Sequence, residues 1–300
     1  MFWRPVATSM WDDQFVKIDL ATIRKMAIIS VFSDDLLMET LVLKGGNAVD
    51  LIHGYGERSS IDIDFSMEAD FENVDDAAKR LSRALRKTFD EAGFTLFDEE
   101  FTQKPNSRSN QSEDFWGGYE IKFKLLEHGK TNIISTDLDS AGRNALVVSP
   151  NQVRTFKMQI SKFEYCKPKI RAELDGFQLY IYTPAMIVLE KVRALCQQMP
   201  EYKLIRHKRP RARDFYDIYS IVSEGSLEIG TPEGLELARC IFEAKKVPLY
   251  FIPRIEEYRN FHKQDWGSVR DSVSGDLYEF DYYFDFVLAQ VQHLKPLWVK

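Results

Sequence analysis

Two acidic side chains at alternate positions, Asp62 and Asp64, are the residues of this 300-residue sequence best suited to chemistry. They lie where charged and apolar residues alternate, as in a half-buried strand. Side chains two apart on a strand share a face, so both carboxylates point one way and Ile61, Ile63 and Phe65 point into a core. Two such carboxylates repel each other unless a cation lies between them, and these oxygen ligands suit Mg²⁺ or Mn²⁺.

A glycine pair, Gly45 and Gly46, follows a short apolar strand expected at 42–44 and begins a helix expected at 46–53. Glycine lets backbone N–H groups approach a phosphate, and the helix would point its positive end at it. Taken alone, an Asp-x-Asp pair is usually a solvated face and a Gly-Gly pair a turn. In the order strand, Gly-Gly, helix, strand, Asp-x-Asp, they predict a phosphate cradle beside a metal site, the arrangement of a nucleotidyltransferase.

A second group of charged residues lies on two expected helices. Lys191 and Arg193 belong to the apolar helix that starts after Thr183, and Asp214 and Asp217 belong to a helix at 211–223. Residues three apart on a helix share a face, so the two carboxylates lie together. A lysine on an apolar helix needs a partner or a phosphate to stay charged. The spacing therefore fits either a ligand site or a structural salt bridge between neighbouring helices.

A basic stretch, KLIRHKRPRAR at 203–213, contrasts with the net charge of −6. That net charge argues against a nucleic-acid binder with a wholly basic surface, but binding follows the local field. The stretch is interpreted either as a solvated loop between two helices or as a phosphate-binding rim for a nucleotide or an RNA strand.

Composition indicates an ordinary globular protein of one or two domains, with 44% hydrophobic residues. No apolar run approaches the roughly 20 residues that span a bilayer, and the first fifteen residues lack the pattern of a signal peptide. The three cysteines are scattered and form no CxxC pair. We therefore expect a cytoplasmic protein without a membrane partner.

The remaining pattern predicts a mixed α/β (α+β) fold with a C-terminal helical bundle. Helices are expected at 17–40 (one or two), 74–92, 184–199, 211–223, 231–246, 253–262 and 277–294, and further strands at 60–66, 94–97, 119–126, 132–135, 156–163 and 177–182. We place a domain boundary near 183, giving a nucleotidyltransferase core at 1–182 and a helical domain at 183–300 that contributes Lys191 and Asp214. The aromatic segment 276–294 is expected to pack against the core.

Four segments resemble, in the same order, the motifs KGGTAL, RxSxDIDL, EKxxAL and RDxYD of the AbiEii/AbiGii toxin family. They are KGGNA at 44–48, RSSIDIDF at 58–65, EKVRAL at 190–195 and RDFYD at 213–217. The resemblance spans about residues 42 to 221 and implies a nucleotidyltransferase of the polymerase-beta type. It assigns nucleotide binding to Lys44, Gly45, Gly46, Arg58 and Lys191. Asp62 and Asp64 would bind the metal, and Asp214 would orient Lys191 or the attacking group.

One position departs from the family pattern. A third acidic residue often lies on a later strand of these proteins, but the matching segment FKMQIS at 156–161 has Gln159 there. A neutral amide coordinates a divalent ion more weakly and cannot act as a base. Either Glu164 or Glu120 replaces the missing carboxylate, the base is dispensable, or activity is reduced.

The resemblance implies a toxin of a toxin–antitoxin or phage-defence (abortive infection) system that depends on Mg²⁺ or Mn²⁺. It would transfer a nucleotide from an NTP, GTP or CTP among the candidates, to an acceptor such as tRNA, and a cognate antitoxin would restrain it. Two alternatives stay open: a binding module that has lost chemistry, suggested by Gln159, and a small-molecule nucleotidyltransferase, which the basic stretch disfavours.

Overall fold

The computed structural model describes residues 19–55, 62–105, 115–148, 152–273 and 275–298, so Arg58 lies outside the described residues. Its α-helices are α1 Leu20–Phe32, α2 Asp35–Thr40, α3 Gly45–Ala48, α4 Val74–Glu91, α5 Asn132–Thr136, α6 Leu138–Asn144, α7 Pro184–Cys196, α8 Ala212–Gly225, α9 Pro232–Ala244, α10 Arg259–Lys263, α11 Trp266–Arg270 and α12 Phe280–Gln292. Its strands are β1 Val42–Lys44, β2 Ile63–Ser66, β3 Phe94–Lys104, β4 Gly118–Glu127, β5 Phe156–Ser161, β6 Ile170–Leu174 and β7 Phe177–Ile181.

The seven strands form one mixed sheet in the order β3-β4-β5-β2-β1-β7-β6. β2 runs parallel to β5 and antiparallel to β1, and β1 runs parallel to β7. The outer pairs β3/β4, β4/β5 and β6/β7 are antiparallel. This topology confirms the predicted mixed α/β class and places the two chemically interesting strands, β1 and β2, side by side near its centre.

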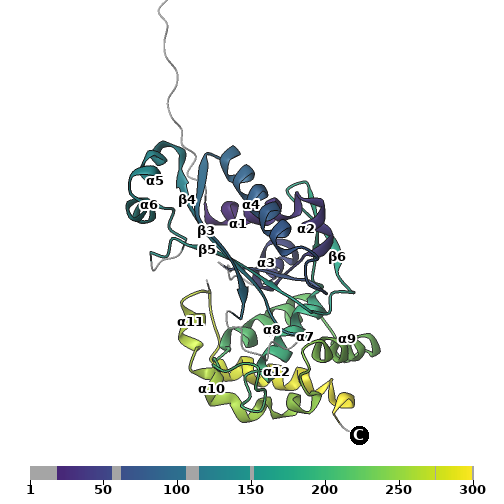
Figure 1. Ribbon diagram of the computed structural model, residues 1–300. Coiled ribbons are helices and arrows are strands. Elements are labelled where there is room, and N and C mark those ends of the chain that lie inside the picture. The colour runs from purple at the N-terminus through teal and green to yellow at the C-terminus, as the bar shows by residue number, and fades with distance from the viewer. Residues whose placement is uncertain (1–18, 56–61, 106–114, 149–151, 274, 299–300) are drawn as a thin grey trace, which may run out of the picture.

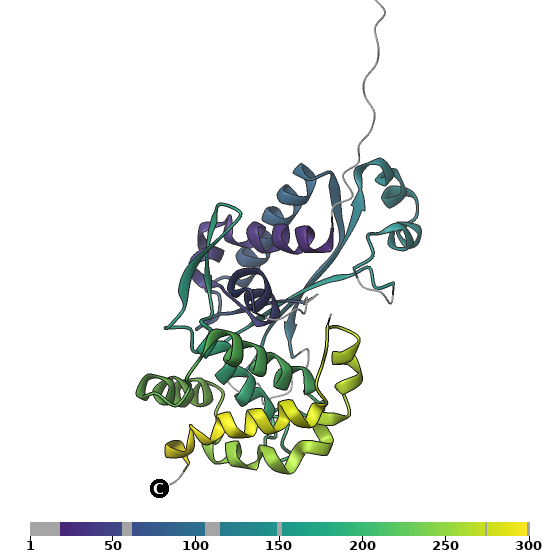
Figure 2. The same ribbon diagram turned by 180° about the vertical axis from the view of Figure 1, so that it is seen from behind.

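One face of the sheet is apolar and packs on α1 and α4, which lie together in the upper half of Figures 1 and 2. Phe65 of β2 contacts Phe32 of α1, and Phe123 of β4 contacts Phe89 of α4, with ring centroids 5.9 and 5.8 Å apart. Ile63 and Phe65 are fully buried, as the alternation in the sequence predicted. The alternate side chains of these strands therefore point to the opposite face.

Helix α4 illustrates how local sequence sets an element's length. Asn73 caps it by accepting a hydrogen bond from the N–H of Asp76, and acidic residues occupy its first turn. The buried residues Ala77, Leu81, Leu85 and Phe89 recur every four positions and form its core-facing stripe. Gly93, with φ of +85°, follows the helix and turns the chain into β3. The predicted helix at 74–92 is confirmed.

The chain after β7 forms the helices α7 to α12, which fill the lower half of Figure 1. The Thr183 hydroxyl accepts a hydrogen bond from the N–H of Met186, and Pro184 occupies the first turn of α7. The aromatic segment 276–294 packs differently from our expectation. Its helix α12 lies on α8, where Phe284 stacks on Phe215 at 4.9 Å, so it completes the helical part and not the sheet part.

Two further predictions need correction. Residues 132–135 belong to helix α5 and do not form a strand. In this helix Ile133 and Ile134 pack on a small hydrophobic cluster that contains Phe97, Leu126 and residues of α6. Strand β6 was missed, although Asp175 and Gly176 both have positive φ, at 50° and 88°, and close a two-residue hairpin to β7. An Asp-Gly pair between extended segments is a hairpin signal that the sequence carries.

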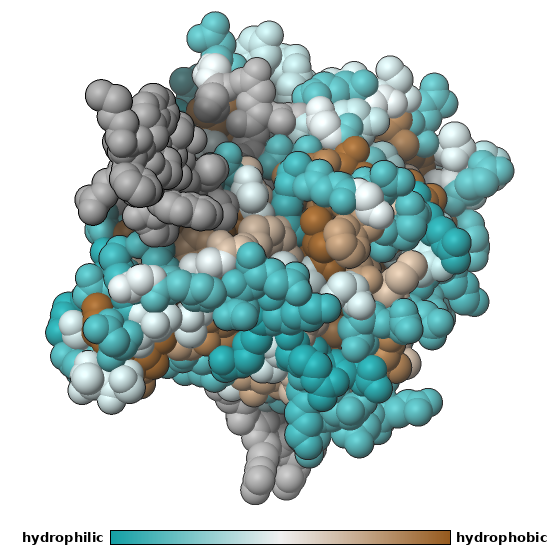
Figure 3. Space-filling view, turned by 90° about the horizontal axis from the view of Figure 1, so that it is seen from above, coloured by the Kyte–Doolittle hydropathy of each residue, from teal (hydrophilic) through white to brown (hydrophobic). Residues whose placement is uncertain are grey.

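Hydrophilic side chains cover most of the face shown in Figure 3, and hydrophobic ones occupy patches between them. Among the described residues, no helix is both long and apolar enough to cross a membrane.

Candidate active site

Four polar side chains form a row across the centre of the sheet, on the face opposite to α1 and α4. Lys44 of β1 is paired with Asp64 of β2. Asp64 is paired on its other side with Gln159 of β5, which in turn is paired with Glu120 of β4. Residues directly paired between strands share a face, so the row presents one carboxylate at its centre with an amide and a second carboxylate beside it.

The glycine turn is in contact with this row. Gly45 has φ of +68°, and a Cβ added to it would lie 2.8 Å from Oδ2 of Asp64. Only glycine meets both conditions without strain. The fully buried Asn47, two residues on, donates a hydrogen bond of 2.7 Å from Nδ2 to the backbone carbonyl of Asp62. The turn and the acidic pair, predicted from sequence to form one site, are thus held against each other.

The electrostatic environment of Asp64 makes its charged form less stable than it is in water, and so raises its pKa. Burial raises the pKa of Asp64 to about 6; Lys44 opposes this rise, and the nearby charges of Glu190 and Asp62 add to it. A divalent cation would relieve both the desolvation and the repulsion. The donor set, two carboxylates with the amide of Gln159 adjacent in the sheet, fits a hard ion such as Mg²⁺ or Mn²⁺.

Lys191 lies across the cleft on α7 and is held by two carboxylates of α8. Its Nζ lies 2.9 Å from Oδ1 of Asp214 and 2.6 Å from Oδ2 of Asp217. Asp214 also accepts a hydrogen bond from Nε of Arg211, a residue of the basic stretch 203–213. Burial alone would raise the pKa of Asp214, but Arg211 and Lys191 outweigh it and the pKa is lowered. Lys191 and Asp214, the residues predicted for the site, therefore also form the salt bridge between the two helices.

A buried ion network links β1 to α7 beneath the cleft. Lys44 Nζ lies 2.5 Å from Oε1 of Glu190 and 3.9 Å from Oε1 of Glu164. Arg193 binds Glu164 at 2.7 Å and Glu190 at 3.4 Å, and Lys245 approaches Glu164 at 3.4 Å. Burial would raise the pKa of Glu164, but these three cations lower it to about 2. The residue before the glycine turn and the residue before Lys191 are thus joined by a direct ion pair.

These groups line one cleft of about 620 Å³ between the polar face of the sheet and helices α7 and α8. All the predicted site residues that the structure describes contribute to it: Lys44, Gly45, Gly46, Asp62, Asp64, Lys191 and Asp214. Lys44 was predicted to bind the nucleotide. Its ammonium is directed at Glu190 and therefore lies beneath the glycine turn.

The basic stretch 203–213 divides into structural and cleft-facing residues. Lys208 donates hydrogen bonds to the carbonyls of Gln197 and Tyr202, at 2.9 and 2.5 Å, and so holds its own loop. Arg211 and Arg213 line the cleft. The side chains of Arg206 and Arg209 are exposed.

Strand pairing shows where Gln159 lies relative to the acidic pair. Gln159 is exposed and directly paired with Asp64 across β2 and β5. Glu164 is occupied by the buried network, and Glu120 pairs with Lys104 and Lys122 at 3.1 and 3.3 Å. In the described part of the chain, no three His, Cys, Asp or Glu side chains are grouped to hold a metal ion.

Sequence reasoning missed several residues of this site. Glu190 belongs to the motif EKVRAL and Asn47 to the motif KGGNA. The motifs therefore indicate that both residues lie near the site, but they do not predict which residues the two side chains contact. Lys245 had no signal, because nothing near it in the sequence indicates that it reaches Glu164 from the end of α9.

Comparison with known proteins supplies the family. A family model described as "Nucleotidyl transferase AbiEii toxin, Type IV TA system" matches residues 27–289. A search of curated proteins found no match. Among solved structures, JHP933 from Helicobacter pylori is 16% identical, with a TM-score of 0.48 over 93% of this chain and 94% of that one. An antigenic nucleotidyltransferase-like protein from Paracoccidioides brasiliensis is 16% identical, with a TM-score of 0.39 over 76% of this chain and 92% of that one.

The family match covers most of the chain and includes the glycine turn, the acidic pair and the helices that bear Lys191 and Asp214. The chain belongs to the AbiEii family of nucleotidyltransferase toxins, assigned to type IV toxin–antitoxin systems.

Proposed function

We propose that this chain transfers a nucleoside monophosphate from an NTP to an acceptor hydroxyl with a divalent cation, Mg²⁺ or Mn²⁺, held by Asp62 and Asp64. The observation that carries the proposal is the close approach of Gly45 to the carboxylate of Asp64, which leaves no room for a Cβ, in a cleft whose other wall bears Lys191. A phosphate seated on the glycine turn would lie against that carboxylate. Family membership supports a transferase acting on a nucleotide.

Each wall of the cleft has a distinct role in this proposal. The backbone N–H groups of Gly45 and Gly46 bind phosphate oxygens, and the ammonium of Lys191 neutralises charge that develops on the leaving pyrophosphate. Asp214 and Asp217 keep Lys191 extended toward the cleft. The bound cation would supply charge neutralisation at the α-phosphate and in-line positioning. Gln159 cannot take the acceptor's proton, so no side-chain base is assigned at that position.

The proposed acceptor is an RNA, such as tRNA, and the proposed nucleotide is GTP or CTP. Arg211 and Arg213 at the cleft, with the exposed Arg206 and Arg209 beside them, provide cations for an incoming phosphate backbone. The family's description supports a toxin with a cognate antitoxin, and a role in abortive infection belongs to the same proposal.

Pyrophosphate release tests this function. Purified protein with each NTP, Mg²⁺ and total RNA should release pyrophosphate with one NTP, and Asp62→Ala should abolish release while its far-ultraviolet circular dichroism stays that of the wild type. Lys157→Gln, an exposed change on the same sheet, serves as the control and should retain release. Release by Asp62→Ala at the wild-type rate would contradict the assignment.

A second candidate function is a binding module on the same fold. The exposed amide of Gln159 beside Asp64 favours it, because a third carboxylate is replaced at the point where an acceptor would be activated. Calorimetry would distinguish the two: NTP binding without pyrophosphate release, under any acceptor offered, supports the module and contradicts the transferase.

A further inference from the structure

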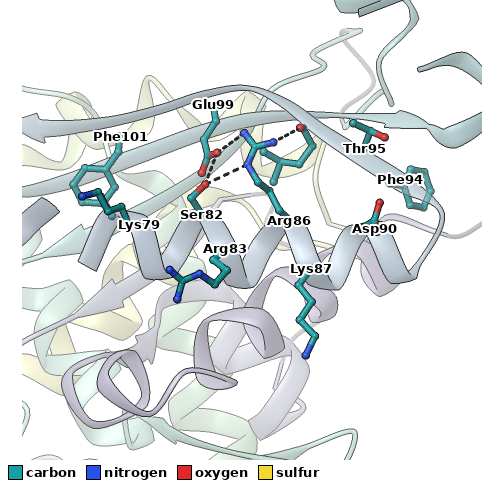
Figure 4. Close-up of a pocket in the computed structure, with 12 residues that line it drawn as sticks. Lys79, Ser82, Arg83, Arg86, Lys87, Asp90, Phe94, Thr95, Glu99 and Phe101 are labelled. Carbon is teal, nitrogen blue, oxygen red and sulfur yellow. Dashed lines mark hydrogen bonds and ion pairs between the residues drawn. The ribbon is translucent and has the colours of Figure 1, made fainter. Parts of the chain in front are cut away.

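A second cavity lies apart from the cleft, between α4 and the edge strand β3. Its volume is about 930 Å³, and its lining shares no residue with that of the cleft. β3 is the outermost strand of the sheet, so the cavity opens along the sheet edge. Figure 4 shows that it is bordered on one side by the length of α4 and on the other by β3.

Hydrogen bonds between α4 and β3 hold one wall of this cavity together. Arg86 donates hydrogen bonds to the carbonyl of Leu96 at 3.0 Å and to Oε2 of Glu99 at 2.8 Å. The hydroxyl of Ser82 donates to the same carboxylate at 2.8 Å. Figure 4 shows Ser82 and Arg86 turned toward Glu99 in this way. The charge of Glu99 is therefore neutralised within the wall and does not repel an anion in the groove.

Three other cationic side chains line the same groove and make no ion pair within the described part of the chain. Lys79, Arg83 and Lys87 recur at intervals of four on α4, and all are exposed. None of them makes an ion pair or a hydrogen bond with another residue that the structure describes. In Figure 4, Arg83 and Lys87 extend from the side of α4 away from β3. Their spacing places three positive charges over about 12 Å of helix.

The Lys79 end of this row lies toward the end of β3 that borders the cleft, while α4 itself packs on the other face of the sheet. α4 and β3 run in opposite directions, so Lys79 lies at the Phe101 end of the groove and Asp90 at the Phe94 end (Figure 4). Three residues beyond Phe101, β3 ends at Lys104, which lines the cleft. That step is about 10 Å along an extended strand. One edge strand therefore connects the outer cavity to the site of the proposed transfer.

We propose that Lys79, Arg83 and Lys87 contact the phosphate backbone of the RNA acceptor while its end to be modified occupies the cleft. This rests on the proposed transfer to RNA. The charge complementarity is local, since the whole chain carries a net charge of −6, and an unpaired row of three cations on such a protein favours a polyanion. Phosphate contacts of this kind fix the position of a nucleic acid without reading its sequence.

Direct RNA binding tests the proposal without requiring catalysis. The triple variant Lys79→Gln, Arg83→Gln, Lys87→Gln is titrated with fluorescently labelled total tRNA at several salt concentrations. Its affinity should fall about tenfold or more, and the slope of log K against log salt should decrease in magnitude by about 2. The NTP dissociation constant should stay unchanged, since these side chains lie outside the cleft.

A matched control removes the same charge elsewhere. Arg239→Gln, Lys263→Gln, Arg270→Gln changes three exposed cations on α9, α10 and α11 and should bind RNA as the wild type does. RNA affinity and salt slope unchanged in the α4 variant would overturn the proposal and leave the row to an acidic protein segment. An equal loss in both triple variants would also overturn it, because net charge alone would then explain binding. Nucleotide transfer by the wild type, measured on the same preparation, reports separately on the proposed function.

Discussion

The buried position of Asp64, proposed above as a metal ligand, costs the fold stability. Its pKa of about 6 in the folded chain, against 3.8 for the free side chain, means that the folded state holds its proton more tightly than the unfolded state. The stability linked to this proton is present below pH 4 and is lost as pH rises through 6. At neutral pH the charged carboxylate therefore destabilises the fold.

Replacing Asp64 by Asn should raise the free energy of unfolding by about 2 to 3 kcal/mol at pH 7, at 1.36 kcal/mol per pKa unit. The gain should shrink as pH falls through 6 and vanish near pH 4, where Asp64 is protonated in both states. Urea unfolding of wild type and variant at pH 4, 5.5 and 7 measures it. A variant less stable than wild type at pH 7 would contradict this account of Asp64.

At the scale of elements, the glycine turn offers a matched pair of substitutions. Gly45 and Gly54 both have φ of +68°, but only at Gly45 does an added Cβ meet another residue, Oδ2 of Asp64 at 2.8 Å. Gly54→Ala should cost about 1 to 2 kcal/mol of stability and leave transfer intact. Gly45→Ala should show the same strain and also displace the carboxylate, lowering transfer on the order of a hundredfold. Equal activities of the two variants would show that the Gly45–Asp64 contact has no role in catalysis.

The ion pair between Lys44 and Glu190 joins the turn to the helix that bears Lys191. Both side chains are largely buried, at 9% and 17% exposure, so Glu190→Gln leaves a buried ammonium without its nearest partner. We expect a loss of about 3 kcal/mol or more in the free energy of unfolding. Glu236→Gln, which breaks the exposed pair with Arg239, should change it by less than about 0.5 kcal/mol. Similar effects of the two changes in chemical denaturation would refute the structural role of Glu190.

The sequence predicted those elements whose signals are local. The fourfold spacing of Leu81, Leu85 and Phe89 identified α4, and the alternation around Asp62 and Asp64 identified the face of β2. Helix α5 was misjudged because its two isoleucines resemble a strand, whereas the hydroxyls of Ser135 and Thr136 bond back to the carbonyl of Asn132. The ion pair of Lys44 with Glu190 spans 146 residues, and no spacing rule reaches that far.

For the whole molecule, the sheet and the helices share one hydrophobic core. Phe65 and Phe123 of the sheet belong to the same contiguous cluster as Ile187, Phe215 and Phe284 of the helices after 183. We therefore expect a single calorimetric unfolding transition in which both parts melt together. Two resolved transitions would contradict a shared core, and would favour separate units divided near residue 183.

The measurement that tests the central claim most directly follows the nucleotide itself. The protein is incubated with each α-³²P-labelled NTP, Mg²⁺ or Mn²⁺, and total cellular RNA, beside the Asp62→Ala variant. We predict label on tRNA-sized RNA with one nucleotide, and none with the variant or after chelation of the metal. Label on protein in place of RNA would contradict the proposed acceptor. No label under any condition would contradict the transferase and favour a binding module, with Gln159→Glu the first variant to examine.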